Sequence, residues 1–584
     1  MAKTPATDSR QASVVALSLM AVVIGVVAGL GAIFLRMLIS VIHNLFFLGE
    51  LSLHYEANEP TLPGPFGPFV ILAPVVGGLI VVFLVKRYAP EAKGHGVPEV
   101  MDAIYYKAGR VRPAVVIIKS LASALSIGSG ASVGREGPII QIGSGMGSVL
   151  GQVFHLRTSQ VITLVAAGAG AGIAATFNTP LGAVLFAVEL MLPEFTSRTL
   201  LPLVLATGTA TYMGRLAFGM EPAFLVATYE RPEIFVPLSV DMLPLYVLFG
   251  LIAGLAGTLF VKALYWTEDL FDGMKVNDYV KNVIAMTSLG VLFYVLLLTT
   301  GMYHTQGVGY ATIQLILTGQ LTAPGFLMLL FVLKMAATSI SLGGGASGGV
   351  FSPSLFLGAA LGASFGALLN MAFPFLGFNT VTFALIGMAA IVGSSTGAAI
   401  TSIIMLFEMT GDYSITVAAI IAVACAVGVR TGLSPQDIYT TKLARRGHHI
   451  PHGLRSHMFG IRMARTVMRP VVGTMEAAAV KPPAMVRPAG DVPASYVVVT
   501  EGRSITGVVE VDPEQPTRTL GPILSPVGVV RETSFLESVM SHMADRGHKA
   551  VLVIPEKRMP RAENVVGVLT RDAIGEVVMR DYRS

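Results

Sequence analysis

The chain has 584 residues, of which 53% are hydrophobic and only 13% are charged. Its mean hydropathy of +0.70 excludes an ordinary soluble domain and indicates a membrane protein with many apolar segments. The net charge of +5 fits basic loops on one side of a membrane and gives no reason to expect a nucleic-acid partner. A single cysteine, Cys425, excludes a disulfide framework.

Apolar segments follow one another along most of the chain. We expect helices embedded in the lipid bilayer over 13–48, 68–85, 113–127, 138–153, 160–175, 180–193, 199–213, 242–261, 281–300, 325–341, 353–373, 381–408 and 414–429. Several of these segments are shorter than the ~20 residues that a helix needs to cross a bilayer. Short, interrupted segments at matching places in two halves of a chain are typical of a transporter with a binding site near the membrane midplane.

The chain contains an internal duplication. Residues 128–138 read GSGASVGREGP and residues 343–353 read GGGASGGVFSP, so that six of eleven positions are identical at an offset of 215. Further pairs at an offset of 215 or 219 are Lys119 with Lys334, Ser126 with Ser341, and Glu189 with Glu408. The sequence therefore predicts two repeats, at roughly 13–215 and 242–430.

Three glycine-rich loops end in a proline at the start of an apolar helix: GHGVP at 94–98, GREGP at 134–138 and GVFSP at 349–353. This pattern is a helix-start signal. A helix N-terminus carries unpaired N–H groups and about +0.5 charge, so converging helix ends would bind an anion weakly enough to release it. Because the loops contain no cage of carboxylates for a cation, the expected substrate is an anion. The lone carboxylate, Glu136, can act as a tethered anion that protonation releases.

These three motifs, in this order and within duplicated halves, resemble the signature motifs of the CLC family of chloride channels and chloride/proton exchangers. The resemblance implies an all-α polytopic membrane protein over 1–446, built from two inverted-topology repeats of broken, tilted helices. It also implies a homodimer with one pore per subunit. An enzyme embedded in the membrane would need a catalytic pair or a metal cluster, and Glu136 has no His, Cys or Asp partner in its loop. We therefore expect a transport protein for chloride, without a catalytic site, a metal or a cofactor.

The resemblance also assigns roles to individual residues. Glu136 corresponds to the gating and proton-accepting glutamate of the family. The residues at positions that bind the anion in the family are His95, Gly134, Arg135, Gly137, Val350, Phe351 and Tyr439. The amides of Val350 and Phe351 would donate to the anion, and the hydroxyl of Tyr439 would contact it from the inner side. His95 stands where many members have serine, which leaves two interpretations: its ring contacts the anion and makes transport depend on pH, or it turns away and the backbone alone acts.

Leu190 departs from the pattern of the exchangers, which commonly carry a second acidic residue here that relays protons from the cytoplasm. Since leucine cannot carry a proton, we expect a channel or weakly coupled conduction. The alternatives are a chloride/proton antiporter with another internal proton route, for which Glu189 is one candidate, or transport of another anion such as fluoride. The equivalence of Glu189 with Glu408 indicates a structural role for both instead.

The C-terminal part, 463–584, follows a linker at 447–462 and reads as a small α/β domain. Strands are expected at 496–499, 505–511, 550–554 and 565–570, and a helix at 534–546. This part resembles the paired CBS domains that many family members carry. Thr570 and Asp572 resemble an adenine-nucleotide contact, although the aspartate falls one position early and the first unit lacks the pair.

Basic residues predict the orientation of the chain. Seven lysines and arginines and a single acid lie between residues 437 and 470, and the cytoplasmic side of membrane proteins is enriched in such positive charge. The sequence therefore predicts a multi-pass protein of the plasma membrane, or of the inner membrane in a bacterium, with a cytoplasmic C-terminal domain.

Overall fold

The computed structural model describes residues 11–226, 242–450, 462–481, 495–502, 504–512 and 514–583. The chain forms two compact units, Met1–Ile450 and Pro451–Ser584, and each is considered by itself. Most of the predicted linker, 451–461, lies outside the described residues.

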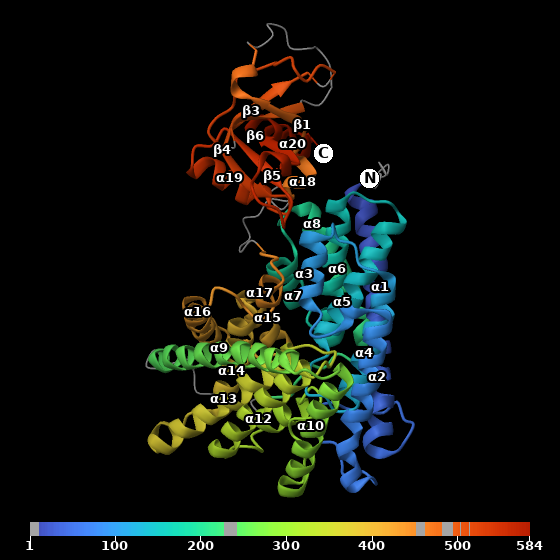
Figure 1. Cartoon of the computed structure of the whole chain (residues 1–584). Coiled ribbons are helices and arrows are strands. Elements are labelled where there is room, and N and C mark those ends of the chain that lie inside the picture. The colour runs from blue at the N-terminus through green and yellow to red at the C-terminus, as the bar shows by residue number, and fades with distance from the viewer. Residues whose placement is uncertain are drawn as a thin grey trace. The chain divides into compact units, whose positions relative to one another are not determined.

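The first unit consists of helices (Figure 1). Its first half contains α1 (Val14–His43), α2 (Leu72–Tyr88), α3 (Val97–Tyr106), α4 (Pro113–Gly128), α5 (Glu136–Val153), α6 (Thr158–Phe177), α7 (Pro180–Phe186) and α8 (Ser197–Phe218). Its second half contains α9 (Leu243–Gly273), α10 (Asp278–Thr300), α11 (Tyr310–Leu317), α12 (Pro324–Gly343), α13 (Phe351–Ala372), α14 (Thr380–Thr396), α15 (Ala399–Thr410) and α16 (Thr416–Leu433), and the short α17 (Thr440–Arg445) follows. Within the described ranges, 8 helices are long and apolar enough to cross a membrane. The predicted all-α polytopic fold is confirmed.

Two details differ from the sequence-based expectation. The segment 381–408 was expected as one helix, but α14 ends at Thr396 and α15 begins at Ala399. Gly397 between them has φ +78°, a left-handed conformation that glycine adopts without strain and that ends a helix. In addition, the short helices α3 and α11 were not among the predicted apolar segments, because neither is long enough to stand out by hydropathy.

Matching glycine contacts hold the helices of each half together. A Cβ placed on Gly143 of α5 would lie 2.1 Å from the carbonyl oxygen of Gly168 on α6, and a Cβ on Gly358 of α13 would lie 2.2 Å from that of Gly387 on α14. Only glycine permits such a close approach of two backbones, which is a common way to pack helices in lipid. Because the two glycine pairs are equivalent at offsets of 215 and 219, the two halves share one packing scheme.

Serines cross between the halves in the same symmetric way. The amide of Ser347 donates to Ser126 Oγ at 3.0 Å, and the amide of Ser132 donates to Ser341 Oγ at 3.0 Å. Ser126 and Ser341 are equivalent at an offset of 215, as are Ser132 and Ser347. Each glycine-rich loop is therefore held by a helix of the other half, which is the arrangement that two related repeats produce around a pseudo-two-fold axis.

The second unit is a six-stranded sheet with helices. Its elements are α18 (Ala464–Val467), β1 (Arg469–Glu476), β2 (Ser495–Glu501), β3 (Ser504–Val511), β4 (Val527–Arg531), α19 (Leu536–Asp545), β5 (Ala550–Ile554), β6 (Gly567–Thr570) and α20 (Arg571–Arg583). The strand order is β3-β2-β1-β6-β5-β4. β1 is parallel to β2, which is antiparallel to β3, and β4 is likewise parallel to β5, which is antiparallel to β6. Two equivalent units thus meet where β1 pairs with β6.

The predicted strands and the predicted helix of this unit are confirmed, whereas β1 and β4 were missed. β5 is buried along its whole length, as expected for a strand covered on both faces. Val551 and Val553 pack with α19 on one face, and Leu552 packs with Tyr496 on the other. Burial raises the pKa of the Tyr496 phenol. The sheet is the small α/β domain that the resemblance to a CBS pair implies.

Candidate functional site

The three glycine-rich loops meet in the middle of the helical unit. Gly134 and Gly349 exchange two backbone hydrogen bonds, with N···O distances of 2.7 and 2.6 Å. The amide of Gly94 donates to the carbonyl of Ala346, and the amide of Gly348 donates to the carbonyl of Gly94, both at 3.3 Å. The loops therefore form one small bridged cluster, although they lie up to 255 residues apart in the chain.

Three helices, α3, α5 and α13, begin at this cluster. A Cβ on Gly137 would lie 1.9 Å from the carbonyl oxygen of His95, and a Cβ on Gly96 would lie 2.7 Å from that of Gly137. The glycines of the motifs are thus required for the backbones to approach one another. The arrangement directs several N-terminal helix ends, with their unpaired amides, at one buried region.

A fourth helix end, that of α11, joins the cluster. Gly307 and Gly309 precede α11 with φ of +53° and +81°, as Gly94 and Gly96 precede α3 with φ of +79° and +84°. This loop is not among the three glycine-rich loops that the sequence predicts. The sequence does contain a pattern that could have revealed this loop. Gly307 of a Gly-X-Gly stands 27 residues before Lys334, much as Gly94 of the other Gly-X-Gly stands 25 residues before Lys119.

A buried lysine fixes each of these two loops. The ammonium of Lys119 donates to the carbonyls of Ala92 at 3.0 Å and of Gly94 at 2.7 Å. The ammonium of Lys334 donates to the carbonyls of Thr305 at 3.1 Å and Gly307 at 2.9 Å. Both lysines are completely buried. Because both ammonium groups donate to backbone carbonyls, we infer that the two lysines stabilise the conformation of these loops.

Glu136 lies at the first turn of α5 and is 2% exposed. The amide of Ser352, in the first turn of α13, donates to its Oε2 at 3.3 Å. The hydroxyl of Tyr310, the first residue of α11, donates to its Oε1 at 2.7 Å, and the Ser352 hydroxyl donates to the same oxygen. The carboxylate thus occupies the kind of position that a bound anion would take at a helix end. Neither Tyr310 nor Ser352 was predicted as a site residue.

His95 is completely buried, and neither ring nitrogen has a hydrogen-bond partner within the described residues. Its ring centroid lies 6.5 Å from that of Tyr439 and 6.4 Å from that of Tyr265. Buried polar groups are rarely left unsatisfied, so the imidazole has hydrogen-bonding capacity for a water molecule or an ion that is not part of the chain.

Tyr439 comes from the segment after α16 and is 1% exposed. Its backbone amide and that of Thr440 donate to Oδ1 of the buried Asp437, at 2.8 and 2.9 Å. Asp437 thereby caps α17 and fixes the backbone that carries the tyrosine. The structure brings Tyr439 close to His95, as the resemblance implies.

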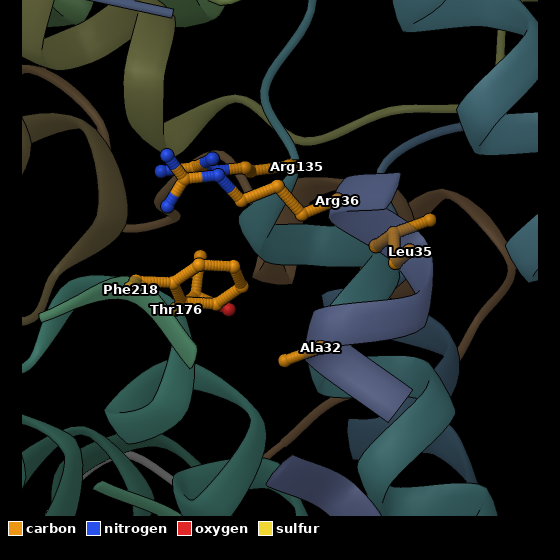
Figure 2. Close-up of a pocket in the computed structure, with 6 residues that line it drawn as sticks. All are labelled: Ala32, Leu35, Arg36, Arg135, Thr176 and Phe218. Carbon is orange, nitrogen blue, oxygen red and sulfur yellow. The ribbon is translucent and has the colours of Figure 1, made fainter. Parts of the chain in front are cut away.

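The remaining predicted residues also lie at the cluster. Val350 is the N-cap of α13 and Phe351 its first residue, and both are buried. Gly134 and Gly137 shape the backbone, whereas the side chain of Arg135 enters a small pocket beside Arg36 (Figure 2). Arg36 forms an ion pair with Glu56 at 3.1 Å. The Nε atom of Arg135 has no hydrogen-bond partner within the described residues, and two guanidinium groups, those of Arg36 and Arg135, line the pocket.

Leu190 lies in the helical turn Ala187–Met191 that follows α7. It is buried and cannot carry a proton. Both oxygens of the neighbouring Glu189 are engaged by α15: the amide of Ile400 donates at 3.2 Å, and the amide and hydroxyl of Thr401 donate at 3.0 and 2.8 Å. This contact indicates that Glu189 caps a helix.

In the second unit, Thr570 Oγ1 accepts a hydrogen bond from the amide of Ala573 at 3.2 Å and so caps the start of α20. Asp572 is exposed in the first turn of the same helix. The position of each residue is accounted for by this helix start.

The chain is similar in sequence to a known protein family and to individual members of it. Residues 77–431 match the model of the family described as voltage gated chloride channel. The chain is 32% identical over 429 residues to the H(+)/Cl(-) exchange transporter ClcA of Vibrio cholerae serotype O1 (strain M66-2), covering 71% of this chain and 89% of the relative. It is also 32% identical over 445 residues to the transporter of the same name from Salmonella newport (strain SL254), covering 75% and 90%.

Solved structures are similar as well. A slow cyanobacterial Cl−/H+ antiporter matches with a TM-score of 0.64 and 26% identity, covering 74% of this chain and 97% of the antiporter. A eukaryotic CLC transporter matches in fold with a TM-score of 0.61 and 19% identity, covering 95% of this chain and 97% of that one. A CLC-type fluoride/proton antiporter matches in fold with a TM-score of 0.59 and 24% identity, covering 73% and 97%.

Proposed function

The chain belongs to the voltage-gated chloride channel (CLC) family, and from this premise we propose that it moves chloride across the membrane through a pore closed by the side chain of Glu136. One observation carries the proposal. The Glu136 carboxylate is buried at the N-terminus of α13 and takes a backbone amide there as its donor. A chloride ion would use the same unpaired amides. The carboxylate and the anion therefore compete for one place.

Protonation decides this competition. An ionised carboxylate is held by partial positive charge at the helix ends, whereas a neutral carboxylic acid is held much less strongly. When Glu136 takes up a proton, the helix ends become available to chloride. Further inward, the ion would accept hydrogen bonds from the amides of Val350 and Phe351, the imidazole of His95 and the hydroxyl of Tyr439. None of these donors carries a full positive charge when the imidazole is neutral, so the ion is bound weakly enough to move on.

Leu190 and Glu189 support channel-like or weakly coupled conduction. Leucine cannot relay a proton, and the Glu189 oxygens are taken up by the helix start of α15. The second candidate is chloride/proton exchange by another internal proton route. It is favoured by the names of the relatives from Vibrio cholerae and Salmonella newport, which are exchange transporters. Fluoride in place of chloride is the remaining substrate alternative.

The test is proton movement in liposomes that contain the purified protein under an outward chloride gradient, with no other ion pathway. The proposal predicts chloride efflux with little uphill proton movement, and a Glu136→Ala variant whose chloride efflux no longer depends on pH. Chloride efflux that drives protons uphill, together with loss of this pumping in Glu136→Ala, would establish the exchanger. Absence of chloride flux would overturn chloride as the substrate, and fluoride flux would then be measured in the same vesicles.

The proposal also covers the assembly of the chain, its location and the role of its second unit. The chain would assemble as a homodimer with one pore per subunit in the plasma membrane, with the second unit on the cytoplasmic side. This unit would act as a CBS-type regulatory domain. Adenine nucleotide at Thr570 and Asp572 is its candidate ligand, and titration calorimetry of the full-length protein with ATP tests it.

A further inference from the structure

We propose that the hydroxyls of Tyr310 and Ser352 position the gate: they hold ionised Glu136 in its closed place and so set the pH at which the pore opens. This inference rests on the proposed function, in which Glu136 closes the pore. It concerns Tyr310, which lies outside the three glycine-loop motifs, and the side chain of Ser352, which lies in the GVFSP loop at 349–353. It predicts a property of the pore that the helix-end amides alone do not explain.

The contacts form a closed group of three side chains. Tyr310 Oη lies 2.7 Å from Glu136 Oε1 and 2.7 Å from Ser352 Oγ, and Ser352 Oγ also donates to Oε1. Tyr310 is 2% exposed and Ser352 is fully buried. Two hydroxyl groups thus donate to one carboxylate oxygen, while the backbone amide of Ser352 donates to the other, Oε2, at 3.3 Å.

The tyrosine is held rigidly enough to act as an anchor. Its ring meets Phe224 edge-on at 5.1 Å between centroids and lies 6.5 Å from Phe177. The Arg135 guanidinium lies 5.3 Å from its centroid. The loop before it is fixed by the ammonium of Lys334 on the carbonyl of Gly307. Because its ring and its loop are both fixed, the hydroxyl stays in place when Glu136 leaves.

Other charged or titratable groups act on Glu136 through space. Lys334 and Tyr439 do so, and Arg135 acts on the neighbouring Tyr310. Within the described residues, none of the three lies within hydrogen-bond distance of the carboxylate. The direct side-chain donors there are the two hydroxyls, which are neutral and favour the ionised carboxylate over the acid because hydrogen bonds to a charged acceptor are stronger.

The sign of the effect follows. Removing the hydroxyls weakens the ionised, closed gate more than the neutral, open one. Chloride transport should then become active at a higher pH than in the wild type. Since one hydrogen bond to a charged group is worth about a tenfold change in an equilibrium, we expect a shift of about one pH unit for each hydroxyl removed.

The experiment measures chloride efflux from liposomes at a series of pH values, set equal on both sides so that the orientation of the protein does not matter. The variants are Tyr310→Phe, Ser352→Ala and the double variant, which keep the ring and the helix intact. The matched controls are Tyr246→Phe and Ser364→Ala, at two buried residues whose described contacts lie elsewhere, with Phe383 and with the carbonyl of Pro324. Glu136→Ala is the reference for a chain without the gate.

We expect the midpoint of the pH profile to move upward in both single variants and further in the double variant, with the controls superposing on the wild type. If Glu136→Ala is insensitive to pH but Tyr310→Phe and Ser352→Ala retain the wild-type midpoint, the inference is wrong and the proposed function stands. If Glu136→Ala keeps the wild-type profile, the proposed function itself fails. Maximal efflux at low pH checks that each variant is folded, and each single variant remains informative if the double variant does not fold.

Discussion

Glu189 and Glu408 each cap a helix of the opposite half. Glu189 receives the amides of Ile400 and Thr401 at the start of α15, at 3.2 and 3.0 Å, and Glu408 receives the amides of Leu181 and Gly182 at the start of α7, at 3.0 and 2.7 Å. The two contacts are equivalent at an offset of 219 residues. A carboxylate at a helix N-terminus is stabilising because it meets unpaired donors and the positive end of the helix dipole.

The first prediction follows from this equivalence. Glu189→Gln and Glu408→Gln should each lower the free energy of unfolding by about 1–2 kcal/mol, because an amide oxygen without charge caps a helix less well. Thermal unfolding in detergent measures the loss. If Glu189 were instead the proton relay, Glu189→Gln alone would abolish proton movement in liposomes, and Glu408→Gln serves as the matched control for that outcome.

The second prediction concerns the buried lysines. Lys119→Met and Lys334→Met should each destabilise the protein by about 3 kcal/mol, because two backbone carbonyls lose their donor in the interior. Arginine should not restore stability, since its larger planar fork does not fit the space of an ammonium. Lys281→Met removes a hydrogen bond to a carbonyl at the surface and should have little effect. Equal melting temperatures for the buried and surface variants would contradict the role of the lysines.

The third prediction tests the close packing of the helix pairs. Gly143→Ala and Gly358→Ala place a methyl group 2.1 and 2.2 Å from a carbonyl oxygen, so the helices must separate, at a cost of at least about 1–3 kcal/mol. We expect less folded protein after purification and a lower melting temperature for both. Gly208→Ala in α8 meets no atom within 4 Å and should be neutral or slightly stabilising, as alanine is the better helix former. A tolerated Gly143→Ala would show that α5 and α6 can move apart freely.

The fourth prediction distinguishes the two interpretations of His95. If the imidazole donates to the anion, His95→Ala should weaken chloride binding about tenfold, the worth of one hydrogen bond to a charged partner. His95→Ser should retain most of the affinity because it supplies a hydroxyl donor, but it should lose any pH dependence that arises from the imidazole. Titration calorimetry with chloride at several pH values measures both effects. Unchanged binding in His95→Ala would assign the contact to the backbone alone.

Much of the site was open to prediction from local patterns. The glycine and proline of each loop predict where α3, α5 and α13 begin, since only these residues combine a positive φ or a close approach with a helix start. The first residues of these helices are Val97, Glu136 and Phe351. The repeat offset likewise paired Lys119 with Lys334 and Glu189 with Glu408, and the structure gives each pair the same contacts.

Other partners could not be predicted. Tyr310 and Ser352 reach Glu136 from 174 and 216 residues away. Tyr310 lies in none of the three motifs, and the GVFSP pattern marks Ser352 only as part of a helix start, without indicating that its hydroxyl meets Glu136. The helix α11 was also missed, because 8 residues make no hydropathy signal of their own.

The sequence by itself determined that the chain is a membrane protein of two related halves, with glycine-rich helix starts suited to an anion and a carboxylate among them. These properties are encoded in composition, spacing and repeat, which need no knowledge of distant contacts. Only the tertiary structure decided which donors meet that carboxylate, that Glu189 is occupied by the helix start of α15, and that the imidazole of His95 has no partner in the described chain. Such contacts depend on how the two halves are packed against each other, and a hydrogen bond is made only when its two atoms come within about 3 Å.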